Sequence, residues 1–543
     1  MENLSTPIVP LRSLPTETPG KRGAGTLKEI PSTEKPSWLT RAVILFLLLT
    51  TLIVAAALRL HRLADLAYWF DESYSLRTAE FPPLEMISRC AGDTHPPFYY
   101  FTLKAWMACF GNGEWAARLL STLWSLGAVA AAFGFTYEGM CCSKERPSNR
   151  NVALLAATLA GLCVALSPIQ ISWAQQVRMY APDTCLAILG TWLLWRAVQE
   201  PHRWGRWLSY AVVEVAGLYT HVTMLFIFAA HVLAIWVVLI QGRKDWAATK
   251  FLFWRAATVM GTVGLIALPW VLVIRMQHAR VHDDFWIPPF TLELLSTALV
   301  QCFTLYQHSV LDPKWGLWLG QGLLLICVFV AAGKRPFDLL LALSASLPFL
   351  LLIAVSQGET NIVNGRYFIT GHSLVCLAVS VWVARLPTWF LKLPVGAVLL
   401  GTLIFLAHDH HTWRESVAGK WAIPELLASW EEHRGTDEPL IFCNPMYYIT
   451  ARIYHDPADL KIFGQEQDYP FYNGTAVTTP QEFLSATELN SGNWQTAWVC
   501  HNGNWGKSKL PAEIGDSWRL SAETTRKDYS GTYFLRRYDR IEK

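Results

Sequence analysis

Long apolar runs separated by short polar segments make up most of the chain between residues 40 and 408. A helix needs about 20 mostly apolar residues to cross a bilayer. The pattern therefore predicts eleven spanning helices, at 40–59, 115–137, 151–168, 181–198, 207–220, 222–240, 255–275, 315–333, 338–355, 367–385 and 394–408. The run 96–110 is shorter and interrupted, and it predicts an interfacial helix. The expected fold class is an α-helical polytopic membrane protein with about eleven transmembrane helices.

The runs 207–220 and 222–240 could instead form one long segment. His221, which follows Tyr219 and Thr220, favours a turn between two helices. The basic residues support this split, because they fall in alternate loops only when the two runs count separately.

Lysines and arginines concentrate in six alternate loops, which the positive-inside rule assigns to the cytoplasm. The loop after the fourth run, for example, carries Arg196, Arg203 and Arg206. The cytoplasmic N-terminus of an inner or plasma membrane protein follows. The segments expected on the extracytoplasmic side are 60–114, 169–180, 276–314, 356–366 and everything after about residue 409. These segments also have the unusual polar residues, so the chemistry is expected there.

The two ends of the chain differ in composition from the apolar middle. Residues 1–39 are rich in Pro, Ser, Thr, Glu and Lys and predict a disordered cytoplasmic tail. Residues 40–408 form the predicted transmembrane domain, with a large first outer loop at 60–114. Residues 409–543 are polar and predict a small extracytoplasmic α/β domain with a helix near 420–433. Its strand-like runs include 440–443, 496–500 and 532–535.

The composition agrees with a membrane location. Of the 543 residues 52% are hydrophobic and only 16% are charged, whereas about one quarter of a typical soluble domain is charged. The 26 Trp and 26 Phe suit the aromatic belts of a membrane protein. The net charge of +3 singles out no partner, and no nucleic acid is expected.

The 11 cysteines show no CxxC pattern, so neither a zinc ribbon nor a redox motif is supported. Most of them lie inside apolar segments, where cysteine behaves as a small hydrophobic residue. Cys443 and Cys500 lie in the polar C-terminal part and could form a disulfide if that part is extracytoplasmic.

Two adjacent carboxylates, Asp71 and Glu72, lie in the first outer loop. Neighbouring residues do not share a face of a helix or a strand. One carboxylate could therefore act on a substrate while the other binds a cation or orients a neighbour. The apolar Trp69 and Phe70 before them provide surroundings in which a carboxylate often acts as a general base. The alternative is an acidic surface loop.

About twenty residues later, Asp93, Thr94 and His95 precede two prolines. Proline restricts the residue before it and starts helices well, so this segment predicts a fixed turn that leads into a helix at 97–110. Asp93 or Thr94 is placed to act as the N-cap of that helix. His95 could contact a phosphate or a metal, although no second histidine has ligand spacing.

Two arginine-containing strings lie on the same predicted side of the membrane. Gln175, Arg178 and Tyr180 are at the outer end of the third run, and Arg366 and Tyr367 are at the outer start of the tenth. The guanidinium group matches a phosphate with a planar fork of donors. Two arginines and one or two carboxylates on one face therefore suit an anionic substrate. Interfacial anchors are the alternative.

The chain resembles the GT-C membrane glycosyltransferases over roughly residues 40–385. The strings that carry this resemblance are WFDESYSLR (69–77), DTHPPFYYFTLKAW (93–106), FGNGEWAARLLS (110–121), SPIQISWAQQVRMYA (167–181) and GRYF (365–368), in this order. They are similar to the family 39-like dolichyl- or polyprenyl-phosphate-sugar transferases, which include protein O-mannosyltransferases and the aminoarabinose transferase of lipid A. The resemblance implies a GT-C fold and a lipid-linked sugar phosphate as donor.

The resemblance also implies roles for single residues. Asp71 matches the first acid of the family pair, the proposed catalytic base. Glu72 matches its neighbour, which positions the loop or the acceptor. Arg178 and Arg366 match basic positions that face the donor phosphate. The predicted substrate-binding residues are Glu72, Asp93, His95, Gln175, Arg178, Tyr180, Arg366 and Tyr367.

The chemistry of these residues agrees with sugar transfer. A sugar phosphate already has a good leaving group, so the departing phosphate needs charge stabilisation, which arginines supply. A base such as Asp71 takes the proton of an acceptor hydroxyl, and direct displacement inverts the anomeric centre. The expected partners are a polyprenyl-phosphate-linked sugar, membrane lipids, and a lipid, glycan or protein acceptor. No cofactor is certain, and a divalent cation at Asp71, Glu72, Asp93 and His95 stays open.

Two other classes of function stay open at this point. A transporter or flippase of a polyprenyl-linked sugar needs ionisable residues deep within its helices, and Glu214 is the clearest one. A receptor or scaffold would use residues 409–543, but it leaves the strings of the outer loops unexplained.

Overall fold

The computed structural model describes residues 37–141, 148–243, 245–283, 286–305, 311–358, 360–503 and 517–541. The chain divides into two compact units, Met1–Ala42 and Val43–Lys543. The tail predicted at 1–39 lies almost wholly outside the described residues. The second unit contains every predicted site residue, and the following description concerns that unit.

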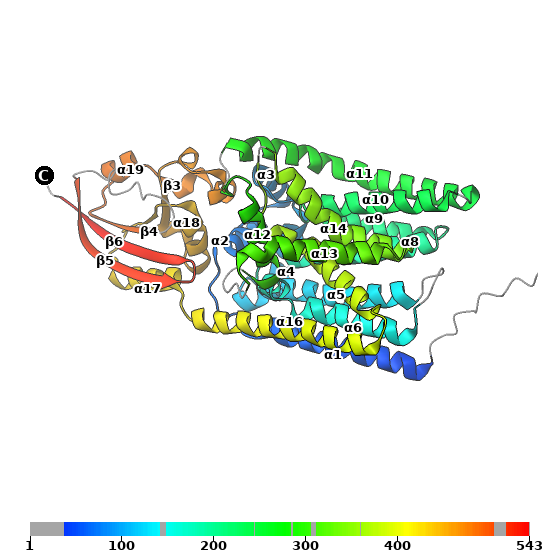
Figure 1. Cartoon of the computed structure of the whole chain (residues 1–543). Helices are drawn as coiled ribbons and strands as arrows, with labels where there is room; N and C mark the ends of the chain where they lie inside the picture. Colours follow the sequence, from blue (N-terminus) through cyan, green and yellow to red (C-terminus); the bar gives the residue numbers. More distant parts are fainter. Residues whose placement is uncertain are drawn as a thin grey trace, which may run out of the picture. The chain divides into compact units, whose positions relative to one another are not determined.

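All eleven predicted apolar runs are helical, and most of these helices are labelled in Figure 1. In order they are α1 (Trp38–Leu60), α5 (Glu114–Cys141), α6 (Arg150–Leu166), α8 (Tyr180–Gln199), α9 (Trp204–Leu218), α10 (Met224–Gly242), α11 (Trp246–Asp283), α13 (Gly316–Ala331), α14 (Pro336–Ser356), α15 (Ile369–Ala384) and α16 (Trp389–Val417). Among the described residues, eight helices are long and apolar enough to cross a membrane. A ninth span results if α6 counts together with the short α7 (Pro168–Ala174). The other two are the largely buried α8 and the 15-residue α9.

Two interruptions in the helical pattern follow from the local sequence. α9 ends at Leu218 and α10 begins at Met224, which confirms the split predicted around His221. α6 and α7 meet at a bend of 58°. Pro168 begins α7, and a proline has no N–H with which to continue the hydrogen bonds of the preceding helix. The bend precedes Arg178, which donates a hydrogen bond to the Asp71 carbonyl.

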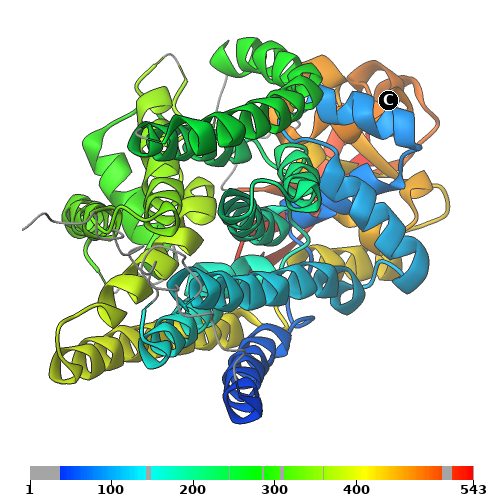
Figure 2. The same cartoon turned by 90° about the vertical axis from the view of Figure 1, so that its right-hand side faces the viewer.

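Small residues allow the long helices to pack closely. Alanines recur on the buried sides of α5 and α6, and these two helices contact one another extensively. Gly139 illustrates the close approach, because a Cβ atom there would lie 2.0 Å from the ring of Phe337. Figure 2 views the long helices from the ends opposite the C-terminal sheet. Close contact through small residues is how membrane helices gain packing energy without a hydrophobic driving force.

Short elements lie where the long helices approach the C-terminal sheet, as Figure 1 shows. They are α2 (Phe70–Glu80), α3 (Pro83–Gly92), α4 (Phe98–Phe110), α12 (Leu292–Thr304) and the 3-10 turns η1 (Pro313–Trp315) and η2 (Gly365–Phe368). α4 is the short helix predicted within 96–110. α2 packs against α4, and it also packs against α18 (Pro445–Tyr454) of the C-terminal part. This end of the bundle is called the site end below.

The polar C-terminal part forms a six-stranded mixed sheet with strand order β3-β2-β1-β4-β6-β5. The strands are β1 (Leu440–Phe442), β2 (Leu460–Phe463), β3 (Phe483–Leu484), β4 (Thr496–Asn502), β5 (Trp518–Asp528) and β6 (Gly531–Arg540). The first four are parallel, and β6 runs antiparallel between β4 and β5. Its other elements are α17 (Ala422–His433), α19 (Ala486–Ser491), η3 (Pro457–Asp459), η4 (Glu466–Asp468), η5 (Phe471–Asn473), η6 (Thr475–Val477) and η7 (Pro480–Glu482). The predicted strands and the helix near 420–433 are all present.

The boundary between the helical bundle and the sheet differs in detail from the expected one. α16 continues to Val417, nine residues beyond the expected end of the transmembrane domain at 408. Cys443 and Cys500 are neighbours at the edge of β1 and β4, where the Cys443 N–H donates to the Cys500 carbonyl at 3.1 Å. No disulfide joins these two described residues.

Candidate active site

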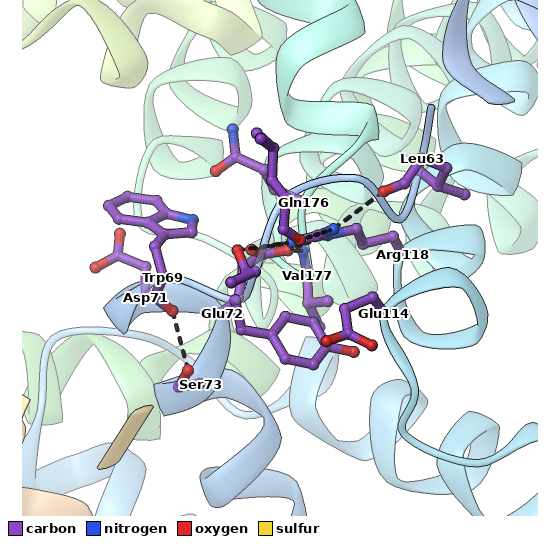
Figure 3. A network of polar contacts seen from close by, with 12 residues as sticks. Leu63, Trp69, Asp71, Glu72, Ser73, Glu114, Arg118, Gln176 and Val177 are labelled. Atoms are coloured by element: carbon purple, nitrogen blue, oxygen red, sulfur yellow. Dashed lines mark hydrogen bonds and ion pairs between the residues drawn. The ribbon is translucent and has the colours of Figure 1, made fainter. Parts of the chain in front are cut away.

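The two adjacent carboxylates lie in the first turn of α2. Trp69 precedes this helix and provides no side-chain cap. Negative charge in a first turn is favourable, because the unpaired N–H groups give a helix N-terminus a partial positive charge. Successive residues of an α-helix point about 100° apart. Figure 3 accordingly shows Glu72 directed at Arg118 and Asp71 directed away from it.

Glu72 is buried, and protein groups occupy its carboxylate. Its side chain is only 1% exposed, and both oxygens accept hydrogen bonds from Arg118, from Nε and Nη2, at 2.8 Å each. The Val177 N–H donates to the same carboxylate at 3.0 Å. Arg118 also donates to the carbonyls of Leu63 and Leu66. The Glu72–Arg118 pair thus joins α2, α5, the segment before α2 and the segment after α7.

Asp71 faces a cavity of about 510 Å³. Its side chain is 16% exposed, and Oδ2 lies 3.1 Å from Nη1 of Arg366 and 3.8 Å from Nε of Arg178. The two arginines come from η2 and from the segment before α8, almost 190 residues apart in the sequence. The structure therefore brings together the carboxylate and the two arginines that the sequence singles out.

Arg178 is held by three further groups. Nη1 donates to the Asp71 carbonyl and to the Ser75 hydroxyl at 3.2 Å each, and Nη2 donates to His95 Nε2 at 3.0 Å. Burial by itself disfavours the charged guanidinium, but Asp71 together with Tyr100, Tyr180 and Asp93 outweighs burial and raises the pKa of Arg178. Because His95 Nε2 accepts a hydrogen bond, the imidazole is neutral there. Burial and the charge of Arg178 also favour the neutral form, because they lower the pKa of His95 well below its ordinary value.

A second histidine continues this polar cluster below the cavity. The rings of His95 and His221 are stacked, with 5.7 Å between their centroids. Burial, Arg178 and Arg366 together lower the pKa of His221 to about 3. His221 Nδ1 lies 2.7 Å from the Thr223 hydroxyl, which in turn donates to Asp183 at 3.0 Å. Neutral imidazoles thus separate the cavity from the buried Asp183.

Asp93 lines the cavity but does not cap α4, so that prediction is wrong. α4 begins at Phe98 after Pro97, with no side-chain cap. The helix starts only after the two consecutive prolines, so Asp93 lies five residues before its first residue. Asp93 instead follows α3, and its N–H donates to the Cys90 carbonyl. Its half-buried carboxyl group interacts with Tyr74 and Arg178, and desolvation raises its pKa.

Three other predicted residues have different positions. Tyr367 lines the cavity, and its hydroxyl accepts a hydrogen bond from Arg366 Nη2 at 3.4 Å. The Gln175 amide donates to carbonyls at the end of α1, including those of Arg59 and His61 at 3.0 Å each. Tyr180 is fully buried under the site, against Trp173 and His221. Gln175, Glu72 and Arg366 line a second cavity of about 310 Å³ next to the first.

The described residues contain no group of three or more His, Cys, Asp and Glu side chains that is placed to hold a metal ion. Of the four residues considered for a divalent cation, Asp71 and Glu72 are paired with arginines. His95 uses Nε2 to accept a bond from Arg178. The positive charge of these arginines makes the arrangement a poor fit for a cation, and no step below involves one.

Two sets of site residues escaped sequence-based prediction. Arg118 lies in a string that carries the family resemblance, but nothing in the sequence pairs it with Glu72. The second set comes from the C-terminal part and includes Tyr447, Tyr472, Asn473 and Tyr529, which line the cavity around Asp71. No pattern signals them, because they belong to loops and short helices of ordinary polar composition.

Comparison with known proteins gives the fold. The family model for dolichyl-phosphate-mannose-protein mannosyltransferase matches residues 94–271. ArnT from Cupriavidus metallidurans in the apo state is similar at a TM-score of 0.60 and 14% identity, over 92% of this chain and 98% of that chain. The same protein bound to undecaprenyl phosphate is similar at 0.54 and 14%, over 92% and 97%. No curated protein sequence gives a significant match.

A third similar structure comes from a different group of enzymes. The oligosaccharyltransferase of Archaeoglobus fulgidus in the apo form has a TM-score of 0.52 at 10% identity, over 92% of this chain and 75% of that chain. All these proteins are GT-C fold glycosyltransferases. The GT-C fold expected from the sequence is therefore confirmed, together with an integral membrane protein that has several apolar helices.

Proposed function

We propose that this chain is a membrane glycosyltransferase that moves a sugar from a polyprenyl-phosphate donor to a hydroxyl group of an acceptor. The observation that carries this proposal is the position of the Asp71 carboxylate between the guanidinium groups of Arg178 and Arg366, in a cavity open to ligands. A base and a paired anion site within 4 Å are what such a transfer requires. The undecaprenyl phosphate bound by the similar ArnT structure supports a donor of this class.

The reaction follows from the placement of the charges. Asp71 Oδ2 faces the two arginines, while no described residue donates a hydrogen bond to Oδ1. Oδ1 accepts the proton of the acceptor hydroxyl while the oxygen of that hydroxyl attacks the anomeric carbon of the donor sugar. The bond from that carbon to the phosphate oxygen breaks, and Arg178 and Arg366 stabilise the charge on the departing polyprenyl phosphate. One displacement of this kind inverts the anomeric centre.

Glu72 acts on the geometry of this site and not on the substrate in this proposal. Its carboxylate is fully engaged by Arg118 and by the Val177 N–H. Val177 is next to Arg178, so the Glu72–Arg118 pair fixes the backbone that carries the Arg178 side chain. A rigid backbone holds the guanidinium group where charge develops.

We further propose that the site end of the bundle is extracytoplasmic and that the N-terminus is cytoplasmic. Arg196 and Arg203 at the ends of α8 and α9 lie away from the site, in agreement with the positive-inside rule. A reporter enzyme active only outside the cytoplasm, fused after residue 543, tests this assignment. Activity of a cytoplasm-specific reporter at that position would reverse it.

The transporter alternative has less support. Glu214, the ionisable residue expected to mark a transport path, is fully buried between α9 and α10, with Oε2 3.3 Å from His231 Nδ1. Tyr210 and Thr191 hydrogen-bond the same histidine. This cluster is separate from both cavities at the site end.

A donor assay with purified protein tests the proposed function. The protein is incubated with a panel of polyprenyl-phosphate sugars and membrane extract, and products are identified by mass spectrometry. We expect release of polyprenyl phosphate with transfer of its sugar, at a rate lowered by about 10²–10⁴ in Asp71→Asn. Transfer at the wild-type rate by Asp71→Asn would remove Asp71 as the base. If no donor in the panel releases polyprenyl phosphate, and a donor instead moves across the membrane of reconstituted vesicles, a transporter would be favoured.

A further inference from the structure

The cavity around Asp71 has two chemically different walls. The helical bundle supplies one wall, with Asp71, Asp93, Arg178 and Arg366 as its charged groups. The segment from Ile423 to Tyr533 supplies the other, here called the C-terminal wall. A single cavity with two such walls can hold two different molecules, and only the bundle wall has the cations that a donor phosphate requires.

Five aromatic side chains dominate the C-terminal wall. They are Tyr447, Phe471, Tyr472, Tyr529 and Tyr533. Rings of this kind offer flat apolar faces, and the tyrosines add hydroxyl groups at their edges. The Tyr447 and Tyr533 rings pack edge to face with 5.3 Å between centroids, so this part of the wall is preformed.

The C-terminal wall is almost uncharged. Within the described part of the chain, it contains no lysine or arginine, and Asp528 is its one charged residue. Asp528 is also already engaged, because it accepts bonds from the Ser530 N–H and hydroxyl and from the Ala422 N–H. The other polar groups of the wall are neutral, from Thr450, Asn473, Asn502 and Ser530. An anion therefore finds no countercharge there, and Asp528 repels it.

The hydroxyl group of Tyr447 in this wall indicates a hydroxylated ligand. Tyr447 is only 6% exposed, and its hydroxyl has no hydrogen-bond partner among the residues that the structure describes. A buried hydroxyl without a partner is costly, and a ligand hydroxyl at the cavity surface would satisfy it. On the opposite wall, Arg178 Nε and Arg366 Nε also lack a hydrogen-bond partner in the described chain.

A peptide fits this wall less well than a sugar does. An extended peptide needs partners for its backbone groups, and proteins usually provide them along the open edge of a sheet. The edge strands of the C-terminal sheet are β3 and β5. Of these, only the last residue of β5, Asp528, lines the cavity.

We infer that the C-terminal wall binds the acceptor and that this acceptor is a neutral carbohydrate. Its rings stack on the tyrosines while its hydroxyl groups bond Tyr447 and the neutral polar side chains, and one of them reaches Asp71. This inference rests on the proposed function, because it assigns the second substrate of the same site. It excludes acceptors that present a phosphate to this wall.

Direct binding tests the inference without a donor. Saturation-transfer NMR on the full-length protein in detergent compares a panel of neutral hexose tetrasaccharides, the same sugars as phosphate monoesters, and a Ser/Thr-rich peptide. We expect signal from a neutral tetrasaccharide and at least tenfold weaker binding of its phosphate ester. Tyr447→Phe keeps the ring and weakens sugar binding about threefold to tenfold, the loss of one hydrogen bond. Tyr472→Ala weakens it about tenfold.

Tyr448→Phe is the matched control. Tyr448 is the next residue, is also buried and packs on Phe442 outside the cavity. Equal losses in both Phe variants, or a preference for peptide or phosphate ester, would overturn the inference. Transfer of sugar to peptide that depends on Asp71 would keep the proposed function and overturn only this inference. Weaker sugar binding in Tyr447→Phe, with no transfer from any donor, would overturn the proposed function and leave only a neutral-sugar site at this wall.

Discussion

Asp71 and Glu72 are neighbours in the chain, but they lie in regions with opposite physical character. Glu72 and Arg118 are 1% and 2% exposed and bind each other through two hydrogen bonds. Asp71 is 16% exposed and lies between two arginines at the wall of a cavity. A sealed ion pair holds backbone segments together, whereas a carboxylate that shares its cations with a cavity can exchange partners with a ligand. We therefore propose a structural part for the carboxylate of Glu72 and a catalytic part for that of Asp71.

The largest expected contrast is between Asp71→Asn and Glu72→Gln. Asp71→Asn lowers transfer by about 10²–10⁴, because an amide cannot take the proton of the acceptor. Its melting temperature changes less than that of Glu72→Gln, which leaves the sealed Arg118 without a counter-ion. Transfer rate and thermal unfolding in the same detergent check both variants. A larger loss of stability in Asp71→Asn than in Glu72→Gln would contradict the assignment.

Arg118→Ala examines the sealed region from its other side. Removing one partner of a buried ion pair costs about 3–5 kcal/mol, and the carbonyls of Leu63 and Leu66 also lose their donor. We expect a large fall in the melting temperature and in the yield of folded protein. Arg196→Ala is the control, since its pair with Glu138 is 39% and 28% exposed and is worth less than about 1 kcal/mol.

Arg366→Lys and Arg178→Lys test how the two arginines of the cavity differ in their effects on transfer and on stability. Lysine keeps the charge but loses the planar fork, so each variant lowers transfer about tenfold, ~1.4 kcal/mol of transition-state stabilisation. Arg178 also bonds Asp71, Ser75 and His95, so Arg178→Lys additionally lowers the melting temperature. Arg366→Lys changes stability less. Rates and melting curves measured together distinguish the two, and equal melting curves would contradict the positioning role of Arg178.

A further expected effect is a pH dependence of stability that comes from His221. Its pKa is about 3 in the folded protein and about 6.5 when exposed, so the unfolded chain binds the proton first. The contribution of His221 to the free energy of unfolding is fully present above about pH 6.5. Below that pH it falls by up to ~1.4 kcal/mol per pH unit, until pH 3. His221→Gln removes this slope in thermal unfolding between pH 7 and pH 4. An unchanged slope would mean that His221 is not buried as a neutral group.

The difference between wild type and His221→Gln isolates His221 from its neighbours. Burial raises the pKa of Asp93, which acts in the opposite direction because protonation of Asp93 favours the folded state. His95 has a lowered pKa and adds a slope of the same sign as His221. Both residues are present in the two proteins being compared, so their contributions cancel to a first approximation.

The local sequence pattern was enough to predict the helices but not the residue that caps the start of α4. All eleven apolar runs are helices because hydropathy over 20 residues is a property of the segment alone. The turn at His221 followed from neighbouring polar residues. The N-cap assigned to Asp93 was wrong, because α4 begins at Phe98, one residue after the expected start, and Pro96 and Pro97 lie between Asp93 and the helix.

By itself the sequence determined a membrane protein with eleven helical runs, a polar α/β C-terminal part, and Asp71, Arg178 and Arg366 as candidates for one site. Only the tertiary structure decided that Glu72 turns inward to Arg118 and that Tyr447 and Tyr529 complete the cavity. The physical reason is that helix formation and membrane partition depend on neighbouring residues, whereas an ion pair or a cavity depends on segments brought together from far along the chain. Glu72 and Arg118 are 46 residues apart, and Tyr447 lies more than 370 residues after Asp71.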